Sequence, residues 1–414
     1  MEYIVGIDLC RDFTQLCIFN NETNTVDSVA LSSDRQSTKV KTAISYSASK
    51  KDFMVYSPLH DGKLDITVIP NLYDLAMSGE HITIDGEDYS SARILARFFR
   101  RIIACINREC EPKDIRGITV TVKDLDLGLK SNLEEALVYY GIPAERIKIC
   151  DHIESFMYYV VMQNKDIWIN DVGLMCFDEE GFKAYVLHFG RKQQPMSIVA
   201  ETSDFSDSVK YSMLKEEDDI RIKYAFESVC GILLHKQNIS AVYATGDGFD
   251  GTWADETLKR ISTGRRIFKG QNLYVKAAAC VAHLTFDGGS ENYLIIGEDD
   301  LKSSIALRAV SGKTQKELAF GNVGQKYYEA GGSCELILDN TNEIDFMIHN
   351  ALKKDSFCAI MTLDALPTRR NKTNRVSVNV RFPSRDCAVV TVKDVGFGAI
   401  RKTDYRIWEQ VINL

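Results

Sequence analysis

The sequence lacks any uninterrupted apolar run of about 18 residues, which is the length that a membrane-spanning helix needs. Its first residues, Met1 to Asp8, also lack the basic segment with which a secretory signal or a transit peptide begins. We therefore expect a protein with no targeting leader and no membrane partner, and we predict a cytoplasmic location.

An excess of basic residues is absent as well. The 414 residues include 50 Lys and Arg against 58 Asp and Glu, which gives a formal net charge of −8. Binding to nucleic-acid phosphates requires a surplus of Lys and Arg, so we expect no nucleic-acid partner. One local basic group is interpreted as a solvated loop and strand face. Its members are Arg369, Arg370, Lys372, Arg375, Arg381 and Arg385.

Motifs of metal and hydrolytic chemistry are missing. The 11 cysteines contain no CxxC pair, and several lie within apolar periodic segments, which favours buried free thiols over disulfides or a zinc site. No GxSxG, HExxH or Walker A motif is present. We interpret His152 as a structural histidine whose ring is satisfied by hydrogen bonds.

One supersecondary pattern occurs twice. A strand at Ile4–Ile7 ends at Asp8 and is followed by two further strands, at 14–19 and 25–31. In mid-chain, a strand at Ile167–Ile169 is predicted to run into Asp171, followed by strands at 174–177 and 182–189. Two copies about 160 residues apart predict a two-lobed duplication.

Strands and helices alternate after each copy, which predicts an α/β fold with a mixed sheet in each lobe. The expected helices cover residues 89–109, 133–140, 155–163, 218–237, 253–261 and 273–284, and the expected strands cover 115–122, 147–150, 241–245 and 266–268. After Gly288-Gly289-Ser290 only short strands follow, at 305–309, 315–320, 333–338, 344–348, 357–363, 376–382 and 388–392, which indicates an all-β sandwich. The predicted domains are lobe I at 1–164, lobe II at 165–288 and the sandwich at 291–414.

Five segments resemble the superfamily of actin, the sugar kinases and the seventy-kilodalton heat-shock chaperones. They are Gly6-Ile7-Asp8, Ile149-Cys150-Asp151-His152, Asn170-Asp171-Val172-Gly173, Val242 to Gly248 and Tyr274 to Ala279. The C-terminal stretch Leu363 to Pro367, with the strands after it, looks like the end of the chaperones' peptide-binding sandwich. The resemblance implies a duplicated ribonuclease-H-like fold that binds ATP or ADP with Mg²⁺.

The resemblance also implies a set of site residues. Asp8 and Asp171 would hold the metal, and Asp151 and Asp171 would be catalytic. The residues implied for nucleotide binding are Asp8, Arg11, Gly173, Gly246, Asp247, Gly248 and Lys276.

The phosphate-binding segments depart from the family pattern. Cys10, Arg11 and Asp12 stand where the family has Gly and small hydroxyl residues, and Leu174, Met175 and Cys176 replace a Gly-Gly-Thr. Ala277 replaces another glycine, and Arg11 is placed to occupy the γ-phosphate position. Each lost hydrogen bond to a phosphate weakens binding by about 1.5–3 kcal/mol. We therefore predict a weak nucleotide binder or pseudo-ATPase.

Several alternatives remain open. Gly246 to Gly251 also fits GxGxxG, but the next strand ends in Lys269 and Gly270 instead of the acidic residue that a dinucleotide-binding fold needs. The leading function is a scaffold that binds a protein or peptide partner through its β-domain. An active ATP-dependent chaperone-like protein is the second hypothesis, and a small-molecule kinase is the third.

Overall fold

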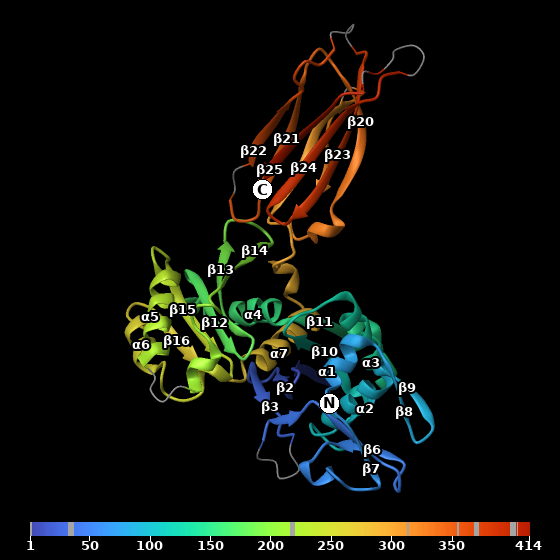
Figure 1. Ribbon diagram of the computed structural model, residues 1–414, viewed down its shortest axis with the longest axis vertical. Helices are drawn as coiled ribbons and strands as arrows, with labels where there is room; N and C mark the ends of the chain where they lie inside the picture. The colour runs from blue at the N-terminus through green and yellow to red at the C-terminus, as the bar shows by residue number, and fades with distance from the viewer. Residues whose placement is uncertain are drawn as a thin grey trace. The chain divides into compact units, whose positions relative to one another are not determined.

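The computed structural model describes residues 2–31, 37–215, 220–312, 314–353, 356–367, 372–397, 403 and 405–414. These residues form a mixed α/β protein with several sheets and a C-terminal region rich in β-structure (Figure 1). Within them, no helix combines the length and the apolar composition needed to cross a membrane.

The first large sheet has the order β11-β10-β1-β2-β3, with β4 paired to β2. β1 runs parallel to β10, and β10 to β11, whereas β1 and β2 are antiparallel. The strands are β1 (Tyr3–Leu9), β2 (Phe13–Asn20), β3 (Thr25–Ser28), β4 (Lys39–Lys41), β10 (Ile115–Val122) and β11 (Ile147–Asp151). Smaller sheets are made by β5 (Ile44–Ser47), β6 (Asp52–Val55) and β7 (Ile66–Ile69), and by β8 (His81–Ile84) and β9 (Glu87–Ser90).

Helices of this first part are α1 (Leu72–Ser78), α2 (Ser91–Ile103), α3 (Leu127–Tyr140) and α4 (His152–Val161). α2 is shorter than predicted at both ends. Ser90 accepts a hydrogen bond from the backbone N–H of Arg93 and caps its start, and the helix ends at Ile103 instead of continuing to 109. α3 ends where predicted, at Gly141, whose φ of 111° only glycine adopts readily. The apolar stripe of α2 packs into the main core with β1 and β10.

The second large sheet has the order β16-β15-β12-β13-β14-β17. Its strands are β12 (Asp171–Asp178), β13 (Gly181–Gly190), β14 (Met196–Asp204), β15 (Ile239–Thr245), β16 (Arg266–Lys269) and β17 (Tyr293–Ile296). The helices around it are α5 (Ile220–Leu234), α6 (Asp255–Ile261) and α7 (Leu273–Phe286). The predicted start of α5 at 218–219 lies outside the described residues. The two large sheets share a five-strand order, in which the strand that comes first in the chain is central, with the next two strands on one side and two later strands on the other. β4 in the first sheet and β17 beyond β14 in the second have no counterpart in this order.

The predicted strand at Ile167–Ile169 is wrong. Lys165–Ile167 form a 3-10 turn, in which the side chain of Asn164 accepts a hydrogen bond from the N–H of Asp166. Trp168 then donates its indole N–H to the carbonyl of Gln163 at 3.2 Å. Strand β12 begins only at Asp171, so this residue opens the first strand of the second sheet instead of closing it.

The C-terminal β-domain, residues 300–414, consists of two four-stranded sheets. Their orders are β19-β18-β21-β22 and β20-β23-β24-β25, and side chains from both sheets share one hydrophobic core. The strands are β18 (Ser303–Ser311), β19 (Thr314–Gly321), β20 (Gly331–Leu338), β21 (Glu343–Asn350), β22 (Ser356–Thr362), β23 (Asn374–Ser384), β24 (Cys387–Asp394) and β25 (Ile407–Asn413). All seven predicted strands are present, and β25 was not predicted.

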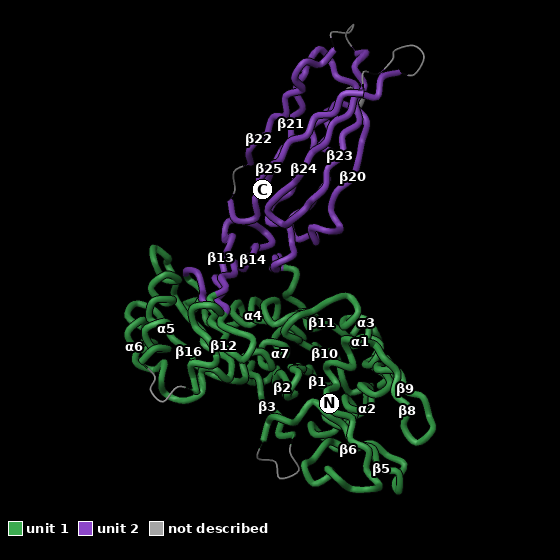
Figure 2. The backbone as a smooth tube through the Cα atoms, in the orientation of Figure 1, with its two compact units in different colours: residues 1–169, 174–182, 205–291 green, residues 170–173, 183–204, 292–414 purple. Residues whose placement is uncertain are grey.

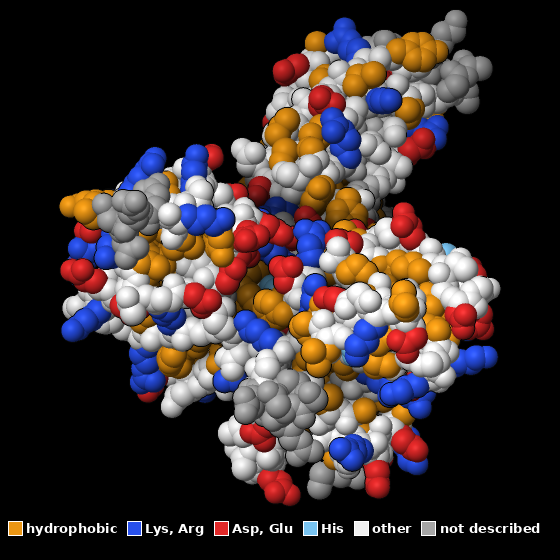
Figure 3. Space-filling model, turned by 60° about the horizontal axis from the view of Figure 1, so that its bottom comes forward, with side chains coloured by type: hydrophobic (Ala, Val, Ile, Leu, Met, Phe, Trp, Pro, Cys, Tyr) orange, Lys and Arg blue, Asp and Glu red, His pale blue; other side chains and the backbone are white. Residues whose placement is uncertain are grey.

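The chain divides into two compact units (Figure 2). The first contains residues 1–169, 174–182 and 205–291, and the second contains residues 170–173, 183–204 and 292–414. The three predicted domain ranges stay a prediction. Basic and acidic side chains are interspersed over the face shown in Figure 3. Of the predicted basic group, Arg369 and Arg370 lie outside the described residues.

Candidate functional site

Asp8 is a buried carboxylate near the end of the central strand β1. Its exposed fraction is 3%, and it lies directly opposite Gln15 on β2 and Thr121 on β10. A carboxylate taken out of water needs hydrogen-bond partners, because an unpaired buried charge is strongly unfavourable. The partners of Asp8 therefore define the local chemistry.

His152 and Cys10 provide those partners. The Nε2 atom of His152 lies 2.9 Å from Oδ1 of Asp8, and the Cys10 thiol donates to the same oxygen at 3.3 Å. These three side chains, which we call the Asp8 triad, have ligand atoms within 4.8 Å of one another. Burial, and then the charge of Asp8, raise the pKa of the Cys10 thiol well above its usual value. His152 thus has the hydrogen-bonded environment predicted for it.

The β11–α4 junction and helix α7 fix the orientation of His152. His152 is the first residue of α4, directly after Asp151 at the end of β11. The ring of Tyr274, on α7, stacks on the imidazole with centroids 3.7 Å apart. The Tyr274 hydroxyl lies 2.7 Å from Sγ of Cys176 on β12. The triad is therefore positioned by strands β1 and β11 and helices α4 and α7, and Tyr274 connects it to β12.

Two of the predicted residues take part in other interactions close by. Arg11 forms an ion pair with Asp74 of α1, with a nitrogen–oxygen distance of 2.8 Å, and both side chains are about half exposed. Asp151 is the N-cap of α4 and accepts a hydrogen bond from the backbone N–H of Glu154 at 2.6 Å. That contact satisfies one of the free amides at the helix start.

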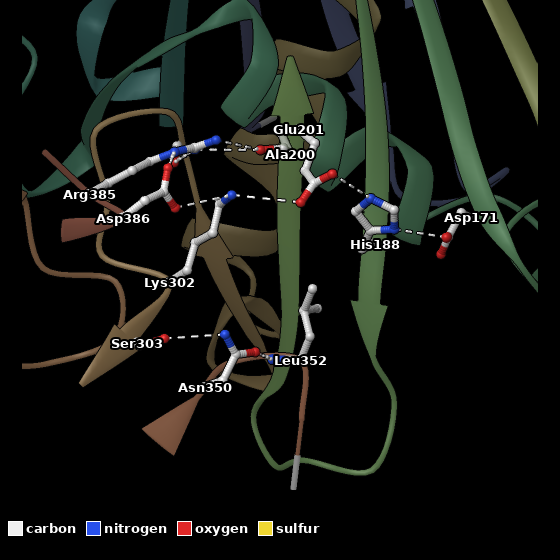
Figure 4. Close-up of polar contacts among 11 residues, drawn as sticks. Asp171, His188, Ala200, Glu201, Lys302, Ser303, Asn350, Leu352, Arg385 and Asp386 are labelled. Carbon is white, nitrogen blue, oxygen red and sulfur yellow. Dashed lines mark hydrogen bonds and ion pairs between the residues drawn. The ribbon is translucent and has the colours of Figure 1, made fainter. Parts of the chain in front are cut away.

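Asp171 belongs to the second compact unit. At the first residue of β12, it accepts a hydrogen bond from Nδ1 of His188 at 2.8 Å, and Nε2 of His188 lies 3.4 Å from Glu201 (Figure 4). The bond to Asp171 raises the pKa of His188 despite its partial burial, and the charges of both carboxylates act in the same direction. Asp171 and the last residue of the strand, Asp178, are separated by about 23 Å of extended chain.

The network around His188 continues into the β-domain. The ammonium group of Lys302 lies 3.7 Å from Glu201 and 3.4 Å from Asp386 (Figure 4). Arg385 donates to the carbonyl oxygens of Gly297 and Ala200, at 3.0 and 3.5 Å. This polar network, which the sequence analysis did not predict, ties β13 and β14 to the C-terminal strands within the second unit.

The predicted glycines lie at points of close packing. A Cβ atom on Gly246, whose φ is 102°, would approach the carbonyl oxygen of Phe177 to 2.2 Å, and one on Gly248 would lie 2.4 Å from the ring of Phe177. A Cβ atom on Gly6 would lie 2.2 Å from the backbone nitrogen of Ala279 in α7. These glycines permit backbone segments to touch.

The remaining predicted residues, Asp247, Gly173 and Lys276, lie on three different elements. Asp247 accepts a hydrogen bond from the hydroxyl of Tyr211 at 3.0 Å. Gly173 is buried in β12, and Lys276 is half-buried on α7.

Three further charged residues were missed by the sequence analysis. The ammonium group of Lys123 lies 2.7 Å from Asp178 and 2.7 Å from Glu180. Asp178 is the last residue of β12, the position in the second sheet that compares with Asp8 near the end of β1. An acidic residue directly after the predicted strand at 174–177 was the signal that could have located Asp178.

The described chain is thus a two-unit α/β protein with a C-terminal β-domain. The family model described as "Family of unknown function (DUF5716) C-terminal" matches residues 25–298, and the model described as "Domain of unknown function (DUF8552)" matches residues 300–414. Because the first covers more than half of the 414 residues, the chain belongs to the DUF5716 family. No curated protein matches the sequence.

Proposed function

We propose that this protein is a pseudo-ATPase of the actin-like fold that acts as a protein-interaction scaffold through its C-terminal β-domain. The shared strand order of the two large sheets supports a duplicated ribonuclease-H-like ancestry. Carboxylates near the ends of β1 and β12, at Asp8 and Asp178, agree with that duplication.

The side chains of the first unit do not fit MgATP as the resemblance would have it. A hydrated magnesium ion prefers oxygen ligands, but Asp8 is bonded to an imidazole and a thiol. Arg11 is paired with Asp74, and Lys123 with Asp178 and Glu180. Gly246 is packed on the backbone of Phe177. The cations that could bind phosphate are thus already paired with carboxylates of the protein, which favours loss of ATP binding at this place.

One observation on the β-domain carries the scaffold proposal: the edge strand β22 has no charged residue and no proline. Its sequence is Ser-Phe-Cys-Ala-Ile-Met-Thr, and the side chains of Phe357 and Ile360 are about half exposed. The other three edge strands, β19, β20 and β25, each contain at least one charged residue. Proteins normally protect an edge strand with charge or proline, and an edge without them is a site where an extended peptide adds as a further strand. The carbonyl of Ile360 accepts a 3.5 Å hydrogen bond from the side chain of Gln410, which an added strand would have to replace.

The test uses short fluorescein-labelled peptides rich in Val, Ile and Thr, with a version of each peptide in which Pro replaces a central residue. Because Pro cannot donate a backbone hydrogen bond, only the first version should bind by strand addition. We expect Ile360→Lys to weaken binding about tenfold, equal to about 1.4 kcal/mol, in a fluorescence-polarisation titration.

Ile337→Lys is the matched control, since Ile337 is an equally exposed isoleucine on the edge strand β20 of the other sheet. Binding that is insensitive to Ile360→Lys, or equal for the proline-containing peptides, would rule out β22 as the docking edge.

The pseudo-ATPase part has its own test. Thermal unfolding of the wild-type chain should be unchanged by several-millimolar MgATP. A ligand at about 100 times its Kd would add about 2.7 kcal/mol of stability, which a melting curve detects easily. A clear upward shift that Lys123→Ala abolishes would instead favour the active chaperone-like alternative.

A further inference from the structure

We propose that the Asp8 triad, with Gln15 beside it, is a binding site for one divalent transition-metal ion of the zinc class. This inference goes beyond the proposed function, because it concerns a different ligand from nucleotide or peptide. It also departs from the sequence analysis, in which cysteine spacing favoured free thiols. The three ligands come from β1, the turn after β1 and the start of α4, and no sequence motif connects them.

The donor types select the metal. The triad offers a thiol sulfur, an imidazole nitrogen and a carboxylate oxygen. Sulfur and imidazole suit Zn²⁺ and related transition metals, whereas Mg²⁺ and Ca²⁺ prefer oxygen alone. Three protein ligands of this kind leave the fourth position of a tetrahedral zinc ion open for another donor.

The separations of the ligand atoms are close to those of a zinc coordination shell. Zinc bonds of about 2.0 Å to N and O, and about 2.3 Å to S, place tetrahedral ligand atoms roughly 3.3 to 3.5 Å apart. The observed separations are 2.9 Å between His152 Nε2 and Asp8 Oδ1, and 3.3 Å between Cys10 Sγ and the same oxygen. The third separation, between Cys10 Sγ and His152 Nε2, is at most 4.8 Å. An ion that enters therefore moves Asp8 Oδ1 slightly away from its two partners and draws the sulfur and the imidazole nitrogen to about 3.5 Å from each other.

Gln15 supplies the second, independent observation. It is directly opposite Asp8 in the β1–β2 ladder, so the two side chains project from the same face of the sheet. Its exposed fraction is 2%, and its amide oxygen has no hydrogen-bond partner within the described residues. A buried hydrogen-bond acceptor without a donor destabilises the fold. A metal ion, or a water molecule bound to the metal, would give the amide oxygen of Gln15 the partner that it lacks among the described residues.

The charges balance when the ion binds. Coordination releases the proton of the Cys10 thiol to solvent and leaves the sulfur as a thiolate, with no change of oxidation state. In the hydrogen-bonded triad His152 holds a proton on Nε2 against Asp8. On metal binding the imidazole changes tautomer: Nε2 gives up that proton, Nδ1 takes one up from solvent, and the neutral ring binds through the lone pair of Nε2. One doubly charged cation, the Asp8 carboxylate, the Cys10 thiolate and a neutral imidazole sum to zero, which suits a buried position.

The experiment titrates the full chain, stripped of metal with a chelator, with Zn²⁺ by calorimetry and with Co²⁺ by absorption spectroscopy. We expect one equivalent of Zn²⁺, and a thiolate-to-cobalt charge-transfer band with Co²⁺. Cys10→Ser and His152→Asn should each weaken Zn²⁺ binding by at least about 100-fold, and Cys10→Ser should abolish the band. Cys105→Ser, which removes an exposed thiol away from the triad, should change neither result.

A second measurement needs no variant. Zn²⁺ should protect Cys10 of the wild-type chain from alkylation, as judged by mass spectrometry of the peptide that contains it. The proposal is overturned if no equivalent of Zn²⁺ binds, if Cys10→Ser keeps both the affinity and the band, or if Cys10 is alkylated equally with and without the metal.

Discussion

At the scale of single residues, the protonation of His188 links stability to pH near neutrality. It is placed between Asp171 and Glu201, and its pKa is raised, chiefly by the hydrogen bond to Asp171. A histidine whose pKa is higher in the folded state stabilises the protein fully below the unfolded pKa of about 6.5. This contribution is lost as the pH rises through the higher, folded pKa.

The corresponding prediction concerns His188→Gln. The wild type should be more stable than this variant at about pH 5.5, and the difference should shrink by about pH 8.5, in urea unfolding curves measured at both values. His81→Gln removes the exposed pair with Asp88 and should change stability little at either pH. A difference between wild type and His188→Gln that grows with pH would contradict the assignment.

Residue types at the candidate site were only partly predictable. Asp8 and His152 were singled out from the sequence, but their contact joins positions 144 residues apart and depends on the packing of β11 beside β10. Gln15 could have been found by counting the register of the predicted hairpin back from Asp8. The role of Lys123 depends on its ion pair with Asp178, which is distant in sequence, so no local sequence pattern predicts it.

At the scale of elements, Asp151 provides a test of helix capping against catalysis. Asp151→Ala should destabilise the protein by about 1 kcal/mol, because the N–H of Glu154 loses its acceptor at the start of α4. Asp151→Asn keeps a good N-cap and should retain most of the stability in the same urea unfolding experiment. Equal losses for both variants would mean that the negative charge itself, instead of the cap, is what the fold requires.

Helices and strands whose apolar residues recur at a regular helical or strand spacing were predicted well. Segments with polar residues on the buried face, or apolar residues on the exposed face, were not. β10 matches its prediction to the residue, and α3 stops at the predicted glycine. β25 was missed because its inward set includes Gln410 and its exposed set includes Ile407 and Val411, which hides the alternation. The apolar triplet Ile167–Ile169 has the composition of a strand, but its first residue ends the 3-10 turn Lys165–Ile167 that Asn164 caps, and the other two follow that turn.

At the scale of the whole molecule, the two compact units predict more than one unfolding transition in calorimetry. Phe98→Ala empties a fully buried position in the core of the first unit, and Phe346→Ala does the same in the β-domain. Each change should cost about 3–5 kcal/mol and lower the temperature of one transition only. A single transition that both variants lower equally would show that the chain unfolds as one cooperative body.

The short strand β17 gives the second unit a mechanical property. It follows the glycine pair Gly288-Gly289 by three residues and lies parallel to β14, in a register from Met196 opposite Tyr293 to Val199 opposite Ile296. Because β17 is already extended and paired along its length with β14, only Asp287 to Asn292 remain as connecting chain between α7 and that strand. The tether after α7 is therefore limited to these six residues, about 20 Å when fully extended, whereas an unpaired segment as far as Ser303 would reach more than twice as far.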